Sequence, residues 1–136
     1  MIDLFVYGTL QIPEVFQAVT GCLLPAEPAR LADHARYRLK GLSYPGLVAE
    51  IGAVTEGLLF RRLVPREVAP LDAFEDDFYE RLAVCVTTLS GETVKAEAYV
   101  VPAASRYRID PRPWCLDEFR SQSLAAFLDR CRAAGS

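Results

Sequence analysis

The sequence predicts an α+β fold: a single compact domain, residues 1–136, whose mixed, mostly antiparallel sheet curls into a small barrel with a few flanking helices. Three observations lead to this prediction. Strand-like runs outnumber helical ones, two of the runs are joined by the short turn of a hairpin, and no repeat or linker divides the 136 residues. A chain of this length can bury a core of its own.

Composition and charge exclude several classes of function. The net charge of −3 and the isoelectric point near 5.2 argue against a nucleic-acid partner. No apolar run approaches the roughly 20 residues of a membrane helix, and no basic leader precedes the first strand, so we expect a cytoplasmic protein without a membrane partner. The four cysteines and the single histidine, His34, lack the spacing of a metal site, and neither a metal nor another cofactor is expected.

The first element is a strand over residues 2–6, rich in β-branched and aromatic residues. It leads into residues 7–10, where Gly8 permits a tight turn and a close approach of backbone N–H groups to a ligand. A short helix over residues 11–20 follows and ends at Gly21. A strand, a glycine turn and a helix start can together bind an anion through unpaired N–H groups, although a lone glycine after a strand is a weak signal.

The next stretch predicts a loop and then a strand. Residues 25–28 are typical of a loop, and residues 30–41 alternate as in a half-buried strand. Arg36, Arg38 and Lys40 fall on the outer face of this strand. We interpret them as a solvated basic face.

Residues 43–46 predict a type II turn, because a proline followed by a glycine suits its two central positions. A short extended run over residues 47–51 is broken by Gly52. A longer strand follows over residues 54–63. Gly57 in its middle indicates a bulge or the close approach of another segment.

The central stretch, residues 64–76, predicts a helix with a carboxylate on its apolar side. Pro65 suits the first helical position, and at about 100° per residue one stripe contains Val64, Val68, Leu71 and Glu75. Glu75 would then point inward at a helix end, where burial would raise its pKa and make it a candidate general acid/base. The alternative is a helix that ends near Phe74 and a solvated Glu75. Asp72 and Asp76 are expected to face water.

The last third of the chain predicts a hairpin, a loop and a helix. Residues 82–88 and 93–101 alternate on either side of a turn, and Tyr99 lies on the face opposite the apolar one, at a wet edge or in a pocket. Residues 102–113 are rich in proline and arginine and predict a long loop. A final helix is expected over residues 117–132.

Four short motifs in order resemble those of the γ-glutamylcyclotransferase-like superfamily, in the branch of the avirulence-induced-gene-like proteins and γ-glutamylamine cyclotransferases. The resemblance covers nearly the whole chain. The motifs are Leu4-Phe5-Val6-Tyr7-Gly8-Thr9-Leu10, Ser43-Tyr44-Pro45-Gly46-Leu47-Val48, Leu71-Asp72-Ala73-Phe74-Glu75 with Tyr79 and Arg81, and Glu97-Ala98-Tyr99-Val100 with Pro113 and Trp114.

This resemblance implies a fold, a reaction and a site. The fold is a compact mixed-sheet barrel, and in the reaction the α-amino group of a small γ-glutamyl compound attacks its own γ-amide carbonyl. The products are 5-oxoproline and a free amine, and no cofactor takes part. The resemblance implies Glu75 as the catalytic acid/base. The substrate-binding residues that it implies are Tyr7, Gly8, Thr9, Leu10, Tyr44, Pro45, Gly46, Tyr79 and Tyr99.

One residue departs from the family pattern: Asp76 stands where the family usually has glycine. A second carboxylate so close would disfavour the charged form of Glu75. Two other functions therefore stay open. The first is a non-catalytic domain of the same fold that binds a small acidic metabolite, and the second is an interaction domain that docks a partner through surface apolar residues such as Phe78 and Trp114. Neither the leaving amine nor the oligomeric state can be read from the sequence.

Overall fold

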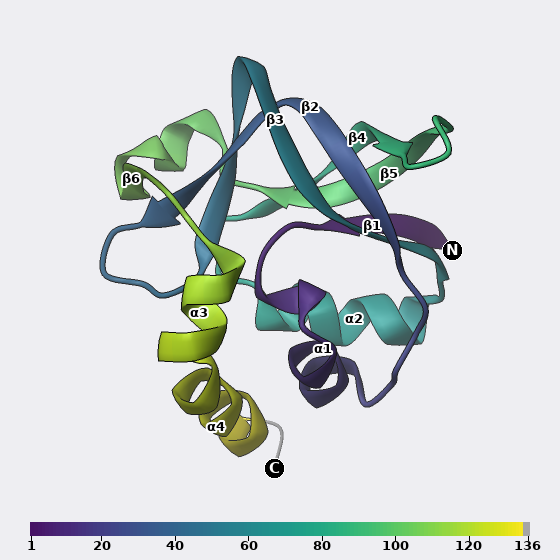
Figure 1. The fold of residues 1–136 in the computed structure, drawn as a ribbon. Coiled ribbons are helices and arrows are strands. Elements are labelled where there is room, and N and C mark those ends of the chain that lie inside the picture. Colours follow the sequence, from purple (N-terminus) through teal and green to yellow (C-terminus); the bar gives the residue numbers. More distant parts are fainter. Residues whose placement is uncertain (135–136) are drawn as a thin grey trace.

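The strands of this computed structural model, which describes residues 1–134, form one sheet that closes on itself (Figure 1). β3 pairs with β1, β1 with β5, β5 with β4, β4 with β2, and β2 again with β3, while β6 adds to β2. Only β1 and β5 run parallel, which confirms the predicted mixed, mostly antiparallel sheet. The strands are β1 (Ile2–Val6), β2 (Glu27–Leu39), β3 (Pro45–Leu63), β4 (Glu80–Thr88), β5 (Thr93–Val100) and β6 (Ile109–Pro113).

The helices gather below β1 in Figure 1, outside the barrel. They are α1 (Pro13–Thr20), α2 (Pro65–Phe74), α3 (Leu116–Gln122) and α4 (Leu124–Ala134), with the short 3-10 turns η1 (Thr9–Gln11) and η2 (Ala103–Arg108). Pro65 begins α2 as predicted, and the Glu67 carboxylate accepts a hydrogen bond from the Val64 N–H at 2.9 Å. Among the helices of residues 1–134, none is long and apolar enough to cross a membrane.

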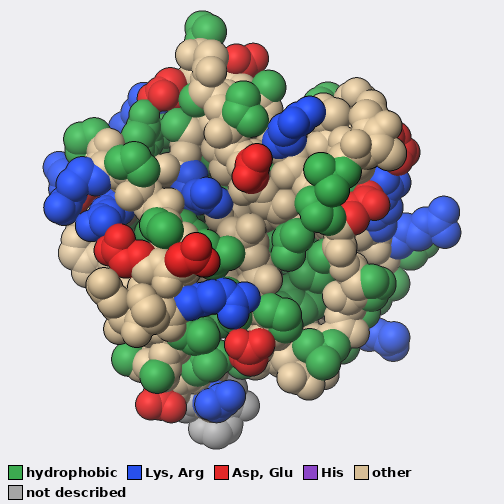
Figure 2. Space-filling model, in the orientation of Figure 1, with side chains coloured by type: hydrophobic (Ala, Val, Ile, Leu, Met, Phe, Trp, Pro, Cys, Tyr) green, Lys and Arg blue, Asp and Glu red, His purple; other side chains and the backbone are tan. Residues whose placement is uncertain are grey.

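Both faces of β1 are buried, because it lies between the barrel interior and the helices. Phe5 and Tyr7 point into the barrel, while Leu4 and Val6 pack toward the helix side. Gly57 of β3 makes this arrangement possible, since a Cβ there would lie 2.3 Å from the Val6 carbonyl oxygen. The predicted close approach at Gly57 is therefore confirmed. On the outer surface, charges of both signs alternate with hydrophobic side chains over the face drawn in Figure 2.

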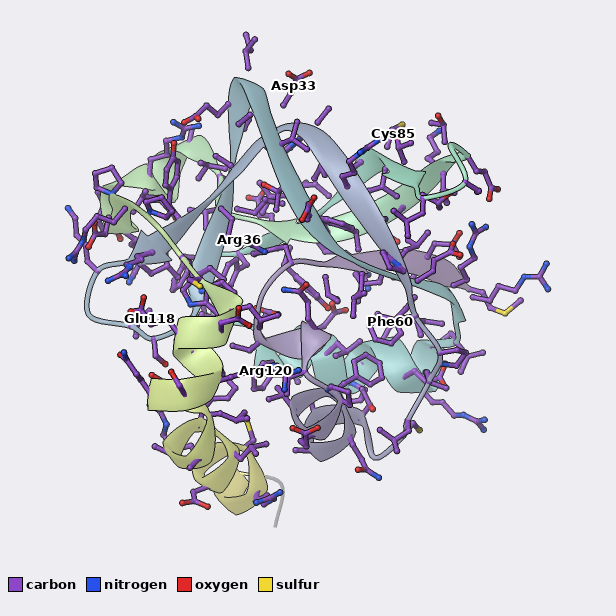
Figure 3. All side chains as sticks on the ribbon, in the orientation of Figure 1. Asp33, Arg36, Phe60, Cys85, Glu118 and Arg120 are labelled. Atoms are coloured by element: carbon purple, nitrogen blue, oxygen red, sulfur yellow. The ribbon has the colours of Figure 1, made fainter. Side chains whose placement is uncertain are left out.

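The ribbon of β2 and β3 differs from its prediction in two places. β2 already begins at Glu27, within the expected loop. β3 is one continuous strand instead of two runs, and its register against β2 shifts between Ala32 and His34. The Gly52 N–H donates to the Asp33 carboxylate at 2.9 Å near the tip of the ribbon, where Figure 3 shows Asp33. This hydrogen bond ties the part of β3 at the register shift to β2, and the strand therefore continues through it.

The turn that precedes β3 lies earlier than residues 43–46. Gly41 has a φ of +74°, and the Leu42 N–H donates to the Leu39 carbonyl at 3.2 Å. Pro45 and Gly46 belong to β3 instead. The type II prediction at Pro45 was wrong because Gly41 supplies the left-handed residue that such a turn needs.

The C-terminal third also departs from prediction. The expected loop over residues 102–113 contains η2 and β6, and β6 pairs with β2 through Arg38 and Asp110. The expected single helix is divided at Ser123, whose φ of −127° interrupts the regular geometry between α3 and α4. Both features depend on packing against distant segments, which local sequence patterns do not contain.

Candidate active site

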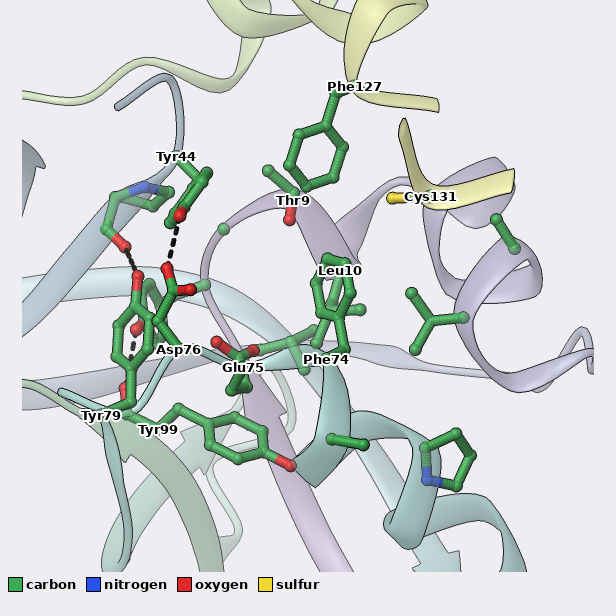
Figure 4. Close-up of a pocket in the computed structure, with 18 of the residues that line it drawn as sticks. Thr9, Leu10, Tyr44, Phe74, Glu75, Asp76, Tyr79, Tyr99, Phe127 and Cys131 are labelled. Carbon is green, nitrogen blue, oxygen red and sulfur yellow. Dashed lines mark hydrogen bonds between the residues drawn. The ribbon is translucent and has the colours of Figure 1, made fainter. Parts of the chain in front are cut away.

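A cavity of about 430 Å³ opens between the end of β1, the C-terminal end of α2 and α4 (Figure 4). Of the residues that the sequence selected, all but one line it. They are Tyr7, Gly8, Thr9, Leu10, Tyr44, Pro45, Glu75, Tyr79 and Tyr99. Gly46 is the exception, because the side chains of Leu39, Val101 and Ile109 enclose it and a Cβ there would meet Val101 at 2.9 Å.

Glu75 stands at the point where α2 ends. Its N–H still bonds to the Leu71 carbonyl at 3.2 Å, but its backbone is extended, with φ −72° and ψ 144°. The helix thus ends at Phe74, as the alternative interpretation held. The Glu75 side chain nevertheless lines the cavity, as the apolar stripe predicted.

The Glu75 carboxyl group has a pKa of about 8, far above its usual value. Burial is the largest cause, because desolvation penalises the charged form. The negative charges of Asp76 and then Asp72 raise the pKa further. A carboxyl group with a pKa near neutrality can both accept and donate a proton at physiological pH.

Three tyrosine hydroxyl groups near Glu75 are fixed by hydrogen bonds. Tyr7 donates to the Tyr99 carbonyl at 2.6 Å, and Tyr99 donates to the Asp72 carboxylate at 2.7 Å. Tyr79 donates to the carbonyl of Pro45 at 2.5 Å. Burial raises the pKa of each of these phenols, so all of them are neutral hydrogen-bonding groups at physiological pH.

Asp76 faces the cavity, and the prediction that it faces water was wrong. It is half-buried and accepts a hydrogen bond from the hydroxyl of Tyr44. The ring of Tyr44 in turn packs edge-on against Phe127 of α4, with ring centroids 6.0 Å apart. Asp76 therefore links the end of α2 to the opposite rim of the cavity, besides contributing a charge beside Glu75.

The segment after β1 lines the cavity and carries free backbone donors. Within residues 1–134, the backbone N–H groups of Gly8, Thr9 and Leu10 form no hydrogen bond, because the 3-10 turn begins with the bond from Gln11 to the Gly8 carbonyl. The Gly8 φ of −122° is not left-handed, so a positive φ is not what requires glycine here. Gly8 is needed because a Cβ would lie 2.9 Å from the ring of Pro45.

Arg36 of β2 holds this segment through a hydrogen bond, and the interpretation of Arg36 as a solvated cation was wrong. Its guanidinium donates to the Tyr7 carbonyl at 2.7 Å and to the Glu56 carbonyl at 3.1 Å, and it lies over the ring of Trp114. Figure 3 shows Arg36 in the interior of the view, among other side chains. Trp114 is only 7% exposed, and its indole N–H donates to the Ser43 carbonyl. Trp114 is therefore a buried residue and not part of a docking surface.

The helix α4 supplies three cavity residues that the sequence did not indicate: Phe127, Arg130 and Cys131. A second hollow of about 370 Å³ adjoins the first and shares Glu75, Asp76, Tyr79 and Tyr99 with it. It is strongly acidic, because its remaining lining residues are Asp72, Asp77, Arg81 and Glu97.

Comparisons with known proteins agree with this fold. The family model described as "Gamma-glutamyl cyclotransferase, AIG2-like" matches residues 4–116. The Arabidopsis thaliana AIG2-like protein C is 36% identical over 130 residues, covering 93% of this chain and 73% of the relative. Arabidopsis protein AIG2 C is 31% identical over 134 residues, covering 96% of this chain and 79% of that protein.

Solved structures share the architecture. The solution structure of an Arabidopsis thaliana protein superimposes with a TM-score of 0.71 and 30% identity, covering 98% of this chain and 81% of that one. A structure named gamma-glutamyl cyclotransferase superimposes with a TM-score of 0.62 over 97% of this chain and 86% of that one; its identity of 14% shows a common fold alone. The chain belongs to the AIG2-like family of γ-glutamyl cyclotransferases.

Proposed function

We propose that this protein cyclises a small γ-glutamyl compound to 5-oxoproline and releases a free amine, with Glu75 as the general acid/base. One observation carries the proposal: a carboxyl group with a pKa of about 8 lines a cavity that is also lined by residues 8–10, whose backbone N–H groups are free. The family membership supports the same class of reaction. A non-catalytic binding domain would instead bind γ-glutamyl compounds without turnover.

The proposed reaction needs proton transfers and no co-reactant. The Glu75 carboxylate takes a proton from the substrate α-ammonium, and the resulting amine attacks the γ-carbonyl carbon to form the ring C–N bond. The amide C–N bond then breaks as Glu75 returns that proton to the leaving nitrogen. The ring nitrogen loses its second proton to the departing amine, which leaves as an ammonium ion. Amine and carbonyl belong to one molecule, so holding the ring-closing shape supplies much of the rate.

The N–H groups of Gly8, Thr9 and Leu10 bind a negative oxygen of the substrate in this proposal. Three free donors at the start of a helical turn suit either the α-carboxylate of the bound substrate or the oxyanion of the tetrahedral intermediate. The neutral tyrosine hydroxyls surround the glutamyl part. Their existing bonds to Pro45, Asp72, Asp76 and Tyr99 fix the shape of this end.

The direct test is release of 5-oxoproline from a panel of γ-glutamyl amines and γ-glutamyl amino acids, measured by chromatography. Turnover of at least one compound supports the proposal. If every compound binds saturably and none is converted, the chain is a binding domain and the proposed reaction is wrong.

The rate should rise with pH through the pKa of Glu75. We expect kcat/KM to increase tenfold per pH unit below about pH 8 and then to level off, since only the deprotonated carboxylate can accept the first proton. Asp76→Asn removes the charge but leaves an oxygen to accept the Tyr44 hydrogen bond. Because the Asp76 charge raises the pKa of Glu75, the midpoint should move to lower pH in this variant. An unchanged midpoint would contradict the assignment.

Gly8→Ala is expected to impair activity more than folding. The new Cβ would lie 2.9 Å from the Pro45 ring and so displace the segment that carries the three free N–H groups. We expect kcat/KM to fall by about tenfold or more with a melting temperature close to wild type. A rise in KM alone indicates that the segment binds the α-carboxylate, whereas a fall in kcat indicates the oxyanion. Wild-type values for both constants would exclude the segment from the site.

A further inference from the structure

The cavity has two chemically different ends, with Glu75 between them. Figure 4 shows Tyr44, Asp76 and Tyr79 on one side of Glu75, and Leu10, Phe74, Phe127 and Cys131 on the other, together with the small side chain of Thr9. α1 and α2 extend the second side with small or apolar residues, namely Ala18, Val19, Pro70 and Ala73. We call this second side the apolar end of the cavity.

The polar end suits the glutamyl part of the substrate. That part carries an α-ammonium and an α-carboxylate, and charged groups need hydrogen-bonding partners when they leave water. The Asp76 carboxylate can accept hydrogen bonds from the α-ammonium there, and the free N–H of Gly8, which packs against Pro45, can donate to the α-carboxylate. If the γ-carbonyl lies at Glu75 and the charged groups lie at the polar end, the leaving group extends toward the apolar end.

The apolar end is unsuited to a cationic leaving group. Apart from Glu75 and Asp76, no carboxylate of residues 1–134 lines the cavity, and Arg130 adds a positive charge to its wall. The carboxylates of Asp72, Asp77 and Glu97 line the adjoining acidic hollow instead. The helices α1, α2 and α4, which lie outside the barrel, thus surround a space that favours a hydrocarbon group.

We propose that the leaving amine carries an apolar aliphatic or aromatic group, which lies between α1, α2 and α4. The inference rests on the proposed function and specifies its substrate class. Ala18 of α1 and Phe127 of α4 are then residues that determine specificity.

The test compares kcat/KM for γ-glutamyl-leucine, γ-glutamyl-phenylalanine, γ-glutamyl-alanine and Nε-γ-glutamyl-lysine. We expect the leucine or the phenylalanine compound to exceed both the alanine and the lysine compounds by about tenfold or more, since each methylene in an apolar pocket contributes roughly that factor. A preference for the lysine compound, or equal values across the panel, would overturn the inference while leaving the proposed reaction intact.

Two variants on α1 test whether the leaving group binds at the apolar end of the cavity. Ala18→Leu fills part of the apolar end and should lower the ratio of kcat/KM for leucine to that for alanine by about tenfold. Gln17→Leu adds the same side chain at the exposed neighbouring position, which does not line the cavity, and should leave the ratio unchanged. A change in Glu75 or in the folded fraction alters kcat/KM for both substrates by the same factor, so it does not change the ratio. An equal effect of the two variants, or none from Ala18→Leu, would contradict the location.

Failure of the proposed function is distinguishable from failure of this inference. If no compound releases 5-oxoproline, the four compounds are titrated into the wild-type protein by calorimetry. A dissociation constant about tenfold lower for leucine than for lysine, lost in Ala18→Leu, would support an apolar ligand site without catalysis. Equal constants, or no binding at all, would overturn the inference.

Discussion

Replacing Glu75 by glutamine is expected to lower turnover by about 10²–10⁴-fold, the usual effect of losing a general acid/base. Glutamine keeps the size and shape of the side chain but cannot exchange a proton. The affinity for substrate should change little, because the tyrosine hydroxyls and the N–H groups of residues 8–10 are untouched. The pH dependence near pH 8 should disappear together with the group that causes it.

The measurement is 5-oxoproline release across pH for the wild type and the variant, with affinity determined by calorimetry. Glu80→Gln is the matched control, because Glu80 is exposed on β4 and lines neither hollow. It should behave as wild type. If Glu75→Gln retains most of its turnover, another group carries the proton and the mechanism is wrong.

The parts of the fold that the sequence predicted correctly are those with local signals. Gly21 ends α1 with a left-handed φ of +77°, and Pro65 begins α2. The β4–β5 hairpin follows from alternation on either side of a turn. The parts that were missed depend on distant partners. β6 is a strand only because β2 lies beside it, and β3 continues past Gly52 because Asp33 on β2 accepts the Gly52 N–H.

The candidate site shows the same division. An apolar stripe along one helix placed Glu75 in the cavity, because helix periodicity is a local property. Family motifs selected the tyrosines, but Gly46 proved to be a packing residue beside Val101. The contribution of α4 was not predictable, because nothing in the sequence of this helix indicates which distant segment it packs against. Asp76 was misplaced because its partner, Tyr44, is distant in the sequence.

Gly57→Ala is expected to destabilise the fold by about 3 kcal/mol, within the range for severe overpacking. A Cβ at this position would lie 2.3 Å from the Val6 carbonyl oxygen and 2.8 Å from the ring of Phe5. The ring could rotate, but the carbonyl belongs to a strand paired on both sides and can move only if β1 moves. Chemical denaturation of wild type and variant measures the difference in the free energy of unfolding.

Gly52→Ala serves as the comparison, because Gly52 has nothing within 4 Å of the added Cβ and only its φ of +87° opposes the change. That strain costs about 1 kcal/mol. Gly57→Ala should also reduce kcat/KM in the fraction that remains folded, since β1 leads directly into residues 8–10, which line the cavity together with Glu75. Gly52→Ala should not, because it lies far along the ribbon from the cavity lining. A Gly57→Ala protein with wild-type stability and activity would show that β1 is not held by this contact, and the placement of the segment opposite Glu75 would then need another cause.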